Sequence, residues 1–199
     1  MTAADMPLSA PLAGPARRGS VLLLFGEGAA GPDLLFIERS ATLRTHAGQP
    51  AFPGGEQDAG DADAIAAALR EAAEEVGLQP ETVRVFATLP PVLVPPIGFV
   101  VTPVLAHWQA PHVVGPVDLA EVAAVERVPI AELVDPANRC AIRYTSGRQG
   151  PAFRVHGLLV WGFTALLTDR VLEWGGWAQP WRPEPLLDRP APPTPNAVQ

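Results

Sequence analysis

Apolar residues along the chain fall into short runs that predict the strands of a buried sheet. Residues 20–25 (SVLLLF) and 33–38 (DLLFIE) are almost continuously apolar, and a glycine- and proline-containing turn separates them, which is typical of two paired strands. Further strands are expected at 83–89, 98–108 and 152–155. The turn-separated runs predict that the first two strands are neighbours in the sheet.

Residues 64–76 (AIAAALREAAEEV) predict a helix whose ends are marked in the sequence. Strong helix formers fill the segment, Asp61 or Asp63 can cap its start, and Gly77 with Pro80 ends it. Apolar residues at spacings of four, three and four form one stripe for the core: Ile65, Leu69, Ala72 and Val76. We therefore expect this helix to pack against the sheet through that stripe.

Two further helices are expected later in the chain. Pro129 suits the first position of a short helix at 129–134, because its missing amide proton would have no partner there. Residues 158–174 form an amphipathic pattern that a pair of glycines ends. Within it, Trp161 is expected to be a core or subunit contact rather than part of a cofactor site.

Strands that alternate with helices indicate an α/β fold, an α/β/α sandwich with a mixed β-sheet between helices. The length of 199 residues suits one domain, which we expect to span 18–180. Prolines gather at both ends, so residues 1–17 and 181–199 are expected to be tails.

Composition excludes several classes of protein. The net charge of −7 disfavours nucleic acid as a partner, and the single cysteine, Cys140, excludes an internal disulfide framework and favours a cytoplasmic location. The longest later apolar run, 157–167, is far shorter than the roughly 20 residues of a membrane span. All fourteen basic residues are arginines, so a charged side chain that contacts phosphate here must be an arginine fork.

The negative charge is concentrated in one stretch of the chain. Residues 54–81 hold eight acidic residues and one arginine, which account for the whole net charge. On a helix, Glu71, Glu74 and Glu75 gather within an arc of roughly 100° nearly opposite the apolar stripe. Carboxylates without histidine or cysteine nearby suit Mg²⁺ or Mn²⁺. The alternative is a solvated acidic face.

A turn-rich loop, residues 39–61, precedes this helix. Its adjacent glycines let backbone carbonyls approach a ligand closely, so the Gly54 carbonyl is able to join the carboxylates on a metal. Arg39, Arg44 and His46 add cationic or polar groups, which would let a phosphate meet both metal and arginine. The alternative is that these three are ordinary surface residues.

Residues 54–78 (GGEQDAGDADAIAAALREAAEEVGL) resemble the Nudix box, G-x5-E-x7-R-E-U-x-E-E-x-G-U, in which U is apolar. The half that begins at Arg70 fits well. With Gly55 as the box glycine, the early glutamate is replaced by Asp61 and the gap to Arg70 is eight residues instead of seven; counted back from Arg70, the glutamate position holds Ala62. Asp61 is therefore the candidate substitute.

The preceding residues 35–55 (LFIERSATLRTHAGQPAFPGG) resemble the extra signature of the coenzyme A pyrophosphatase branch, L-L-T-x-R-S/A-x3-R-x3-G-x3-F-P-G-G. The residues that match in register are Arg39, Ser40, Arg44, Gly48 and 52–55. The two motifs cover about 44 contiguous residues.

The resemblance implies the Nudix fold and a metal-dependent pyrophosphohydrolase. Glu71 and Glu75 would be the leading ligands of Mg²⁺ or Mn²⁺, with Glu74 and the Gly54 carbonyl in support. Glu121 resembles a loop glutamate that returns to the site in many Nudix proteins; a surface glutamate is the alternative. Together with Glu71 and Glu74, Arg70 would form the catalytic set by orienting a neighbouring carboxylate. Glu71 can be ligand, general base or both.

By the same resemblance the substrate is coenzyme A (CoA) or an acyl-CoA, cleaved to 3′,5′-ADP and 4′-phosphopantetheine. Arg39, Arg44, His46 and Gly48 would bind it, and its 3′-phosphate gives either arginine a partner. The proline-broken segment 89–99 is either a wall for adenine or pantetheine or an ordinary connection. The alternatives are another nucleoside diphosphate derivative, such as ADP-ribose or NADH, and a non-catalytic ligand sensor. The protein is expected to be a monomer or a homodimer.

Overall fold

The computed structural model describes residues 17–43, 46–94 and 99–190, which form two sheets and three α-helices. The larger sheet contains β1 (Arg17–Gly28), β2 (Gly31–Arg39), β3 (Pro50–Ala51), β4 (Gly54–Glu56), β5 (Val83–Thr88), β6 (Val92–Val94), β7 (Phe99–Trp108) and β8 (Val122–Pro129). The smaller sheet contains β9 (Arg139–Arg143), β10 (Gln149–Val155), β11 (Leu158–Val160) and β12 (Leu186–Asp188). The helices are α1 (Ala64–Val76), α2 (Ile130–Val134) and α3 (Gly162–Trp174).

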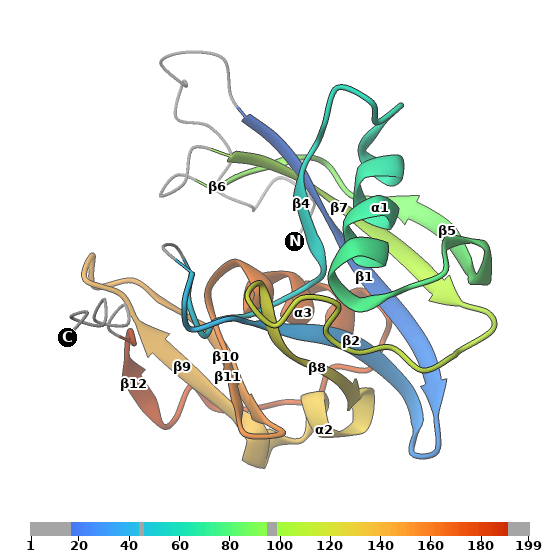
Figure 1. Cartoon of the computed structure of the whole chain (residues 1–199). Helices are drawn as coiled ribbons and strands as arrows, with labels where there is room; N and C mark the ends of the chain where they lie inside the picture. The colour runs from blue at the N-terminus through green and yellow to red at the C-terminus, as the bar shows by residue number, and fades with distance from the viewer. Residues whose placement is uncertain (1–16, 44–45, 95–98, 191–199) are drawn as a thin grey trace.

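The larger sheet splits between its first two strands, as Figure 1 shows. Strands β1 and β2 pair only near their hairpin, from Phe25↔Leu34 to Gly28↔Gly31. Away from the turn, β1 pairs with β7 and β4, whereas β2 pairs with β8 and β3. The chain crosses the split between β3 and β4, and there the Leu22 N–H donates to the Pro53 carbonyl over 2.8 Å.

The two faces of the larger sheet build two separate cores because side chains alternate along a strand. Leu22 and Leu24 of β1 point to the core that contains α1, whereas Leu23 between them points to the core that contains α3. The two helices therefore cover opposite faces of the sheet (Figure 1), which confirms the expected sandwich.

Helix α1 begins and ends where the sequence indicates. The Asp63 side chain caps it by accepting from the N–H groups of Ile65 and Ala66, and Gly77 ends it in the left-handed conformation at φ 72°. The predicted stripe faces the core, with Ala72 and Val76 fully buried. Of the two predicted capping residues, Asp63 is the cap, and Asp61 has a different partner, described below.

The region after residue 150 differs in two ways from expectation. Residues 158–160 are strand β11, paired with β10 through Phe153↔Val160, and α3 begins only at Gly162. The positive φ of Gly162, 67°, separates strand from helix. The fold also continues past residue 180, where a tail was expected: β12 pairs with β9 through Leu186↔Ala141. Local periodicity contains no information about such partners.

Of the remaining expectations, the short helix α2 forms with Pro129 as its N-cap residue rather than as its first helical residue. Residues 1–16 and 191–199, which include nearly all of the first expected tail and the last nine residues of the second, lie outside the described residues. Within the described ranges, no helix has both the length and the apolar character that a bilayer crossing requires.

Candidate active site

Glu75 lies on α1 beside the split in the larger sheet and is almost fully buried, with 6% of its surface exposed. Its Oε2 accepts a hydrogen bond of 2.9 Å from the Gly54 N–H, and its Oε1 lies 3.8 Å from Nη1 of Arg39. Burial raises the pKa of Glu75 to about 7, although the Gly54 N–H and Arg39 both act to lower it. The nearby carboxylates of Glu71 and Glu121 raise it further.

Glu71 lies one helical turn before Glu75 and is also partly buried, with 18% of its side chain exposed. Burial raises the pKa of Glu71, and the adjacent Arg70 partly offsets that effect. The Glu71 carboxylate packs directly on Gly55, where a Cβ atom would lie 2.5 Å from the carboxylate carbon. A glycine is therefore needed at this position for Glu71 to keep its place.

Gly54 is constrained even more tightly. A Cβ atom on Gly54 would lie 2.2 Å from the Ser20 carbonyl oxygen, so any side chain would push β4 away from β1. Its predicted role was a carbonyl ligand of the metal. What the structure adds is that its N–H donates to Glu75, so the two adjacent glycines each contact one of the two central carboxylates.

Arg70 joins the start of the box to the acidic face of the helix. Its Nε and Nη2 each donate to one carboxylate oxygen of Asp61 over 3.0 Å, and Nη2 also donates to the Glu56 carbonyl. Its Nη1 lies 3.1 Å from the Glu71 carboxylate and 3.0 Å from that of Glu74. Arg70 thus holds several acidic groups in place, as expected of an orienting residue, and Asp61 is its bidentate partner.

Glu74 and Glu121 are more exposed than the central pair. The Glu74 side chain is 60% exposed and contacts Arg70. Glu121 is exposed too, and its backbone carbonyl accepts from the Ser40 N–H over 2.8 Å. Its loop is tied to the end of α1, since the Val117 N–H donates to the Glu75 carbonyl over 3.1 Å. The loop therefore brings the charge of Glu121 close enough to act on Glu75.

The loop that carries the coenzyme A signature folds back on β2. The Gly48 N–H donates to the Arg39 carbonyl over 2.9 Å, and the Arg39 N–H donates to the Gln49 carbonyl over 3.1 Å. His46 has a left-handed backbone, and its Nδ1 lies 2.8 Å from Oε1 of Gln49. Arg44 lies outside the described residues.

The donor set suits a hard divalent cation bound partly by its substrate. Glu71 and Glu75 offer two oxygen-donor groups that burial has deprived of water, and a cation would restore the stability of their charged forms. Within the described ranges, no group of three or more His, Cys, Asp or Glu side chains could hold a metal ion. Mg²⁺ is commonly held by one or two carboxylates together with water and substrate phosphates, which matches this arrangement.

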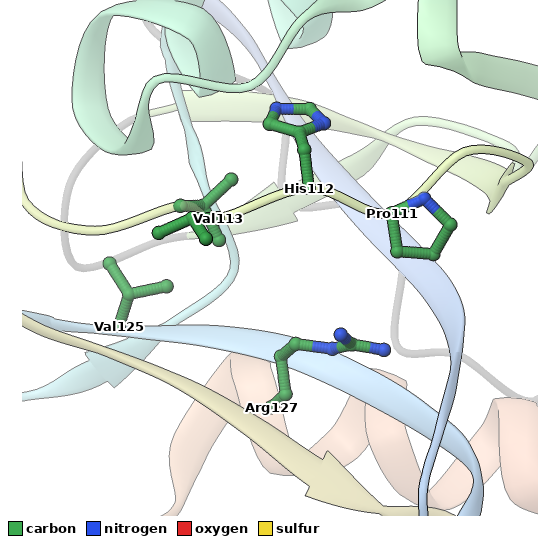
Figure 2. A pocket seen from close by; sticks show the side chains of 6 residues that line it. Pro111, His112, Val113, Val125 and Arg127 are labelled. Carbon is green, nitrogen blue, oxygen red and sulfur yellow. The ribbon is translucent and has the colours of Figure 1, made fainter.

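Two cavities are lined by other residues of the described ranges. The larger, of about 530 Å³, opens between the loop after β7 and strand β8, and Figure 2 shows Arg127 crossing its floor. That guanidinium already pairs with Asp33, its Nη2 lying 2.6 Å from Oδ2, and lies over the Trp108 ring. The smaller cavity, of about 330 Å³, lies between the signature loop and β11.

Two residues that line the smaller cavity were not predicted as site residues. Trp161 packs against the buried Cys140, Ile142 and Ala152, as the predicted core contact requires, and it also lines the cavity. Glu38 of β2 was not considered in the sequence. A usable signal was the position of Glu38 and Gln49 inside the signature segment. His156, far along the chain from the box, bridges Glu126 and Glu132 at 3.0 and 3.3 Å.

Two carboxylates on α1, one buried and one partly buried, are held against a two-glycine strand in an α/β/α sandwich, an arrangement that suits a divalent ion. The chain belongs to the Nudix family: the family model described as NUDIX domain matches residues 15–145. It is thus a Nudix hydrolase, an enzyme that cleaves pyrophosphate bonds, and Nudix hydrolases generally use divalent metal ions.

Relatives of known name agree with this assignment. The chain is 42% identical over 160 residues to a protein of Citrobacter koseri named Uncharacterized Nudix hydrolase NudL, covering 75% of this chain and 78% of that one. A protein of the same name from Cronobacter sakazakii is 52% identical over 107 residues, 51% of this chain and 52% of that one. The crystal structure of RenU, a Nudix hydrolase from M. smegmatis, has a TM-score of 0.58 at 22% identity, covering 87% and 91% of the two chains.

Proposed function

We propose that this Nudix hydrolase cleaves the pyrophosphate bond of CoA or an acyl-CoA and releases 3′,5′-ADP and 4′-phosphopantetheine or its acyl derivative. The observation that carries the proposal is the position of Arg39. This residue belongs to the segment that resembles the CoA signature, and its guanidinium lies 3.8 Å from the buried carboxylate of Glu75. The signature and the box thus meet at one point of the fold.

In this proposal Glu71 and Glu75 hold Mg²⁺ or Mn²⁺, with Glu74, Glu121 and the Gly54 carbonyl as further candidate ligands. A bound ion of this kind neutralises phosphate charge and lowers the pKa of a water molecule. The chain's own contribution is to fix the carboxylates before substrate arrives. The Gly54 N–H holds Glu75 at 2.9 Å, and Arg70 holds Glu71 at 3.1 Å.

The proton of the attacking water needs an acceptor. Glu71 and Glu74 are the candidates, because both lie on the face of α1 that Arg70 orients. Glu71 is the more buried of the two, with 18% of its side chain exposed against 60% for Glu74, and it is a candidate for metal ligand, general base or both. Hydrolysis breaks one P–O bond of the anhydride. The oxygen of the water joins the phosphorus that is attacked, and the bridging oxygen leaves with the other phosphate product.

Substrate binding falls to Arg39, Arg44, His46 and Gly48 in this proposal. Arg39 supplies positive charge at the diphosphate, and the backbone bond from Gly48 to its carbonyl fixes the loop against β2. The single cysteine supports a cytoplasmic setting, and we propose a monomer or a homodimer that acts on this small molecule without nucleic-acid or membrane partners.

The test compares substrates directly. Purified protein is incubated with CoA, acetyl-CoA, NADH and ADP-ribose in Mg²⁺ and then in Mn²⁺, and products are identified by mass spectrometry, with Glu75→Gln as the control for contaminating activity. The expected result is 3′,5′-ADP and a phosphopantetheine from CoA, at rates that fall by orders of magnitude in the variant. Preference for ADP-ribose or NADH would overturn the CoA assignment, and no product from any of the four would favour a ligand sensor.

A further inference from the structure

We propose that the smaller cavity, between the signature loop and β11, binds the adenine base of the substrate. Its walls come from distant parts of the chain: Glu38, Gln49 and Pro50, then Leu158 and Trp161, and finally Pro190. The volume of about 330 Å³ falls in the range of small-molecule sites. The inference rests on the proposed function only in requiring an adenine nucleotide as substrate.

The charge of the lining excludes the phosphate end of such a substrate. Among the residues that line the cavity, all of which belong to the described ranges, there is one carboxylate, that of Glu38, and no cation. The Arg189 guanidinium lies over the Trp161 ring, 5.6 Å from its centroid, but is not itself a lining residue. A phosphate in direct contact with the lining would meet the carboxylate of Glu38. The positive charge of the site lies instead at Arg39, beside Glu75. The cavity therefore suits an uncharged part of the substrate.

The same lining matches a nucleobase in both its flat faces and its polar edge. Trp161 provides an indole, and because the Arg189 guanidinium already lies over this ring at 5.6 Å, a base would stack on the part of the indole that faces the cavity; proline and leucine side chains provide apolar contacts. The Glu38 carboxylate can only accept hydrogen bonds, as the 6-amino group of adenine requires. The carbonyl oxygen of the Gln49 side chain is engaged by His46 at 2.8 Å, which leaves its amide N–H₂ to donate to a ring nitrogen.

The cavity is also joined to the reacting groups by the backbone. Glu38 lines the cavity, and the next residue, Arg39, contacts Glu75. The pairing of β2 with β8 shifts register between Glu38 and Arg39, so at the end of β2 one residue lies at the cavity and the next at Glu75. The Arg39 N–H bond to the Gln49 carbonyl, 3.1 Å long, fixes the loop that carries the third group. One nucleotide can therefore span both positions at the end of this strand.

The experiment measures binding without turnover. Adenosine 5′-monophosphate is titrated against purine riboside 5′-monophosphate, which lacks only the 6-amino group, by isothermal calorimetry on the wild type, Glu38→Ala and Glu38→Gln. Neither ligand contains an anhydride, so hydrolysis cannot interfere. We expect about a tenfold preference for the adenine ligand in the wild type, most of it kept by Glu38→Gln, which retains an acceptor, and lost in Glu38→Ala.

A second variant tests the stacking wall. Trp161→Ala should weaken both nucleotides about equally and by tenfold or more, whereas Trp161→Phe should restore most of the affinity because it keeps an aromatic face. Circular dichroism shows whether each variant is folded. If the adenine preference is absent in the wild type or unchanged in Glu38→Ala, the inference is wrong. It is also wrong if Trp161→Ala weakens 4′-phosphopantetheine and leaves the nucleotides unchanged, since the cavity would then hold the other half of CoA.

The two proposals fail separately. If CoA is not the preferred substrate but the preference for adenine depends on Glu38, the base site is supported and its ligand is another adenine nucleotide. Turnover of CoA without that preference would keep the proposed function and remove the base site.

Discussion

The buried carboxylate of Glu75 should make the protein less stable as pH rises, and removing its charge should reverse this. Glu75 is 6% exposed, and its pKa is raised from 4.5 to about 7, mainly by burial. A folded-state pKa above the unfolded value means that the stabilising contribution is complete below pH 4.5 and is lost as pH rises through 7. The difference of about 2.5 pKa units corresponds to roughly 3 kcal/mol of unfolding free energy.

The test uses Glu75→Gln, which keeps the shape and removes the charge. Urea unfolding of both proteins in the presence of a chelator at pH 5 and pH 8 gives the difference in unfolding free energy. We expect the unfolding free energy of the variant, relative to that of the wild type, to rise by roughly 3 kcal/mol from pH 5 to pH 8, because only the wild type must bury a charge at pH 8. Added Mg²⁺ should stabilise the wild type more than the variant at pH 8, because a ligand that binds only the folded state stabilises it.

Glu74→Gln is the matched control. Glu74 lies on the same helix, but its side chain is 60% exposed, so its charge stays in water. Loss of its exposed pair with Arg70 should cost only about 0.3–0.5 kcal/mol and should change little between pH 5 and pH 8. If the difference in unfolding free energy between Glu75→Gln and the wild type also stays constant from pH 5 to pH 8, or if the variant is the less stable protein at pH 8, burial of charge is not what raises the pKa of Glu75.

Three further predictions concern neighbouring groups. Gly55→Ala should leave the circular dichroism spectrum unchanged and lower kcat about 10- to 100-fold, because the new methyl group displaces the Glu71 carboxylate; wild-type kcat would contradict that contact. Asp61→Asn should lower turnover at least tenfold by weakening the hold on Arg70, and an unchanged rate would show that the pair does not position the site. Hydrogen bonding to a β8 carboxylate raises the pKa of His156, so His156→Gln should have a lower Tm than the wild type at pH 5.5 and an equal one at pH 9; a constant difference would refute this.

The candidate site lies where β1 and β2 stop pairing with each other. Because β1 and β2 separate after Phe25 and Leu34, their backbones are completed by β4 and β3 instead of by each other. The connection between β3 and β4 then crosses from one strand pair to the other, and the N–H of Gly54, the first residue of β4, donates to Glu75. The break in pairing between β1 and β2 thus places a backbone donor beside the buried carboxylate of Glu75.

Much of α1 could be predicted because its determinants are local. The cap at Asp63, the end at Gly77 and the apolar stripe all depend on residues within a few positions of each other, so the sequence was sufficient for them. The same locality placed Glu71 and Glu75 on one face. Periodicity alone did not distinguish a metal site from a solvated acidic surface on that face. The resemblance to the family motif favoured the metal site.

Only the tertiary structure decided which partner each of these groups has. Asp61 was equally suitable as a cap or as a substitute box residue, and the fold leaves the cap to Asp63 and pairs Asp61 with Arg70. The strand at 158–160 and the pairing of β12 with β9 depend on neighbours far away in the chain, which a local pattern does not specify. Burial of the Glu75 carboxylate has the same origin, since the pKa of a side chain follows from the solvent and charges that the whole fold places around it.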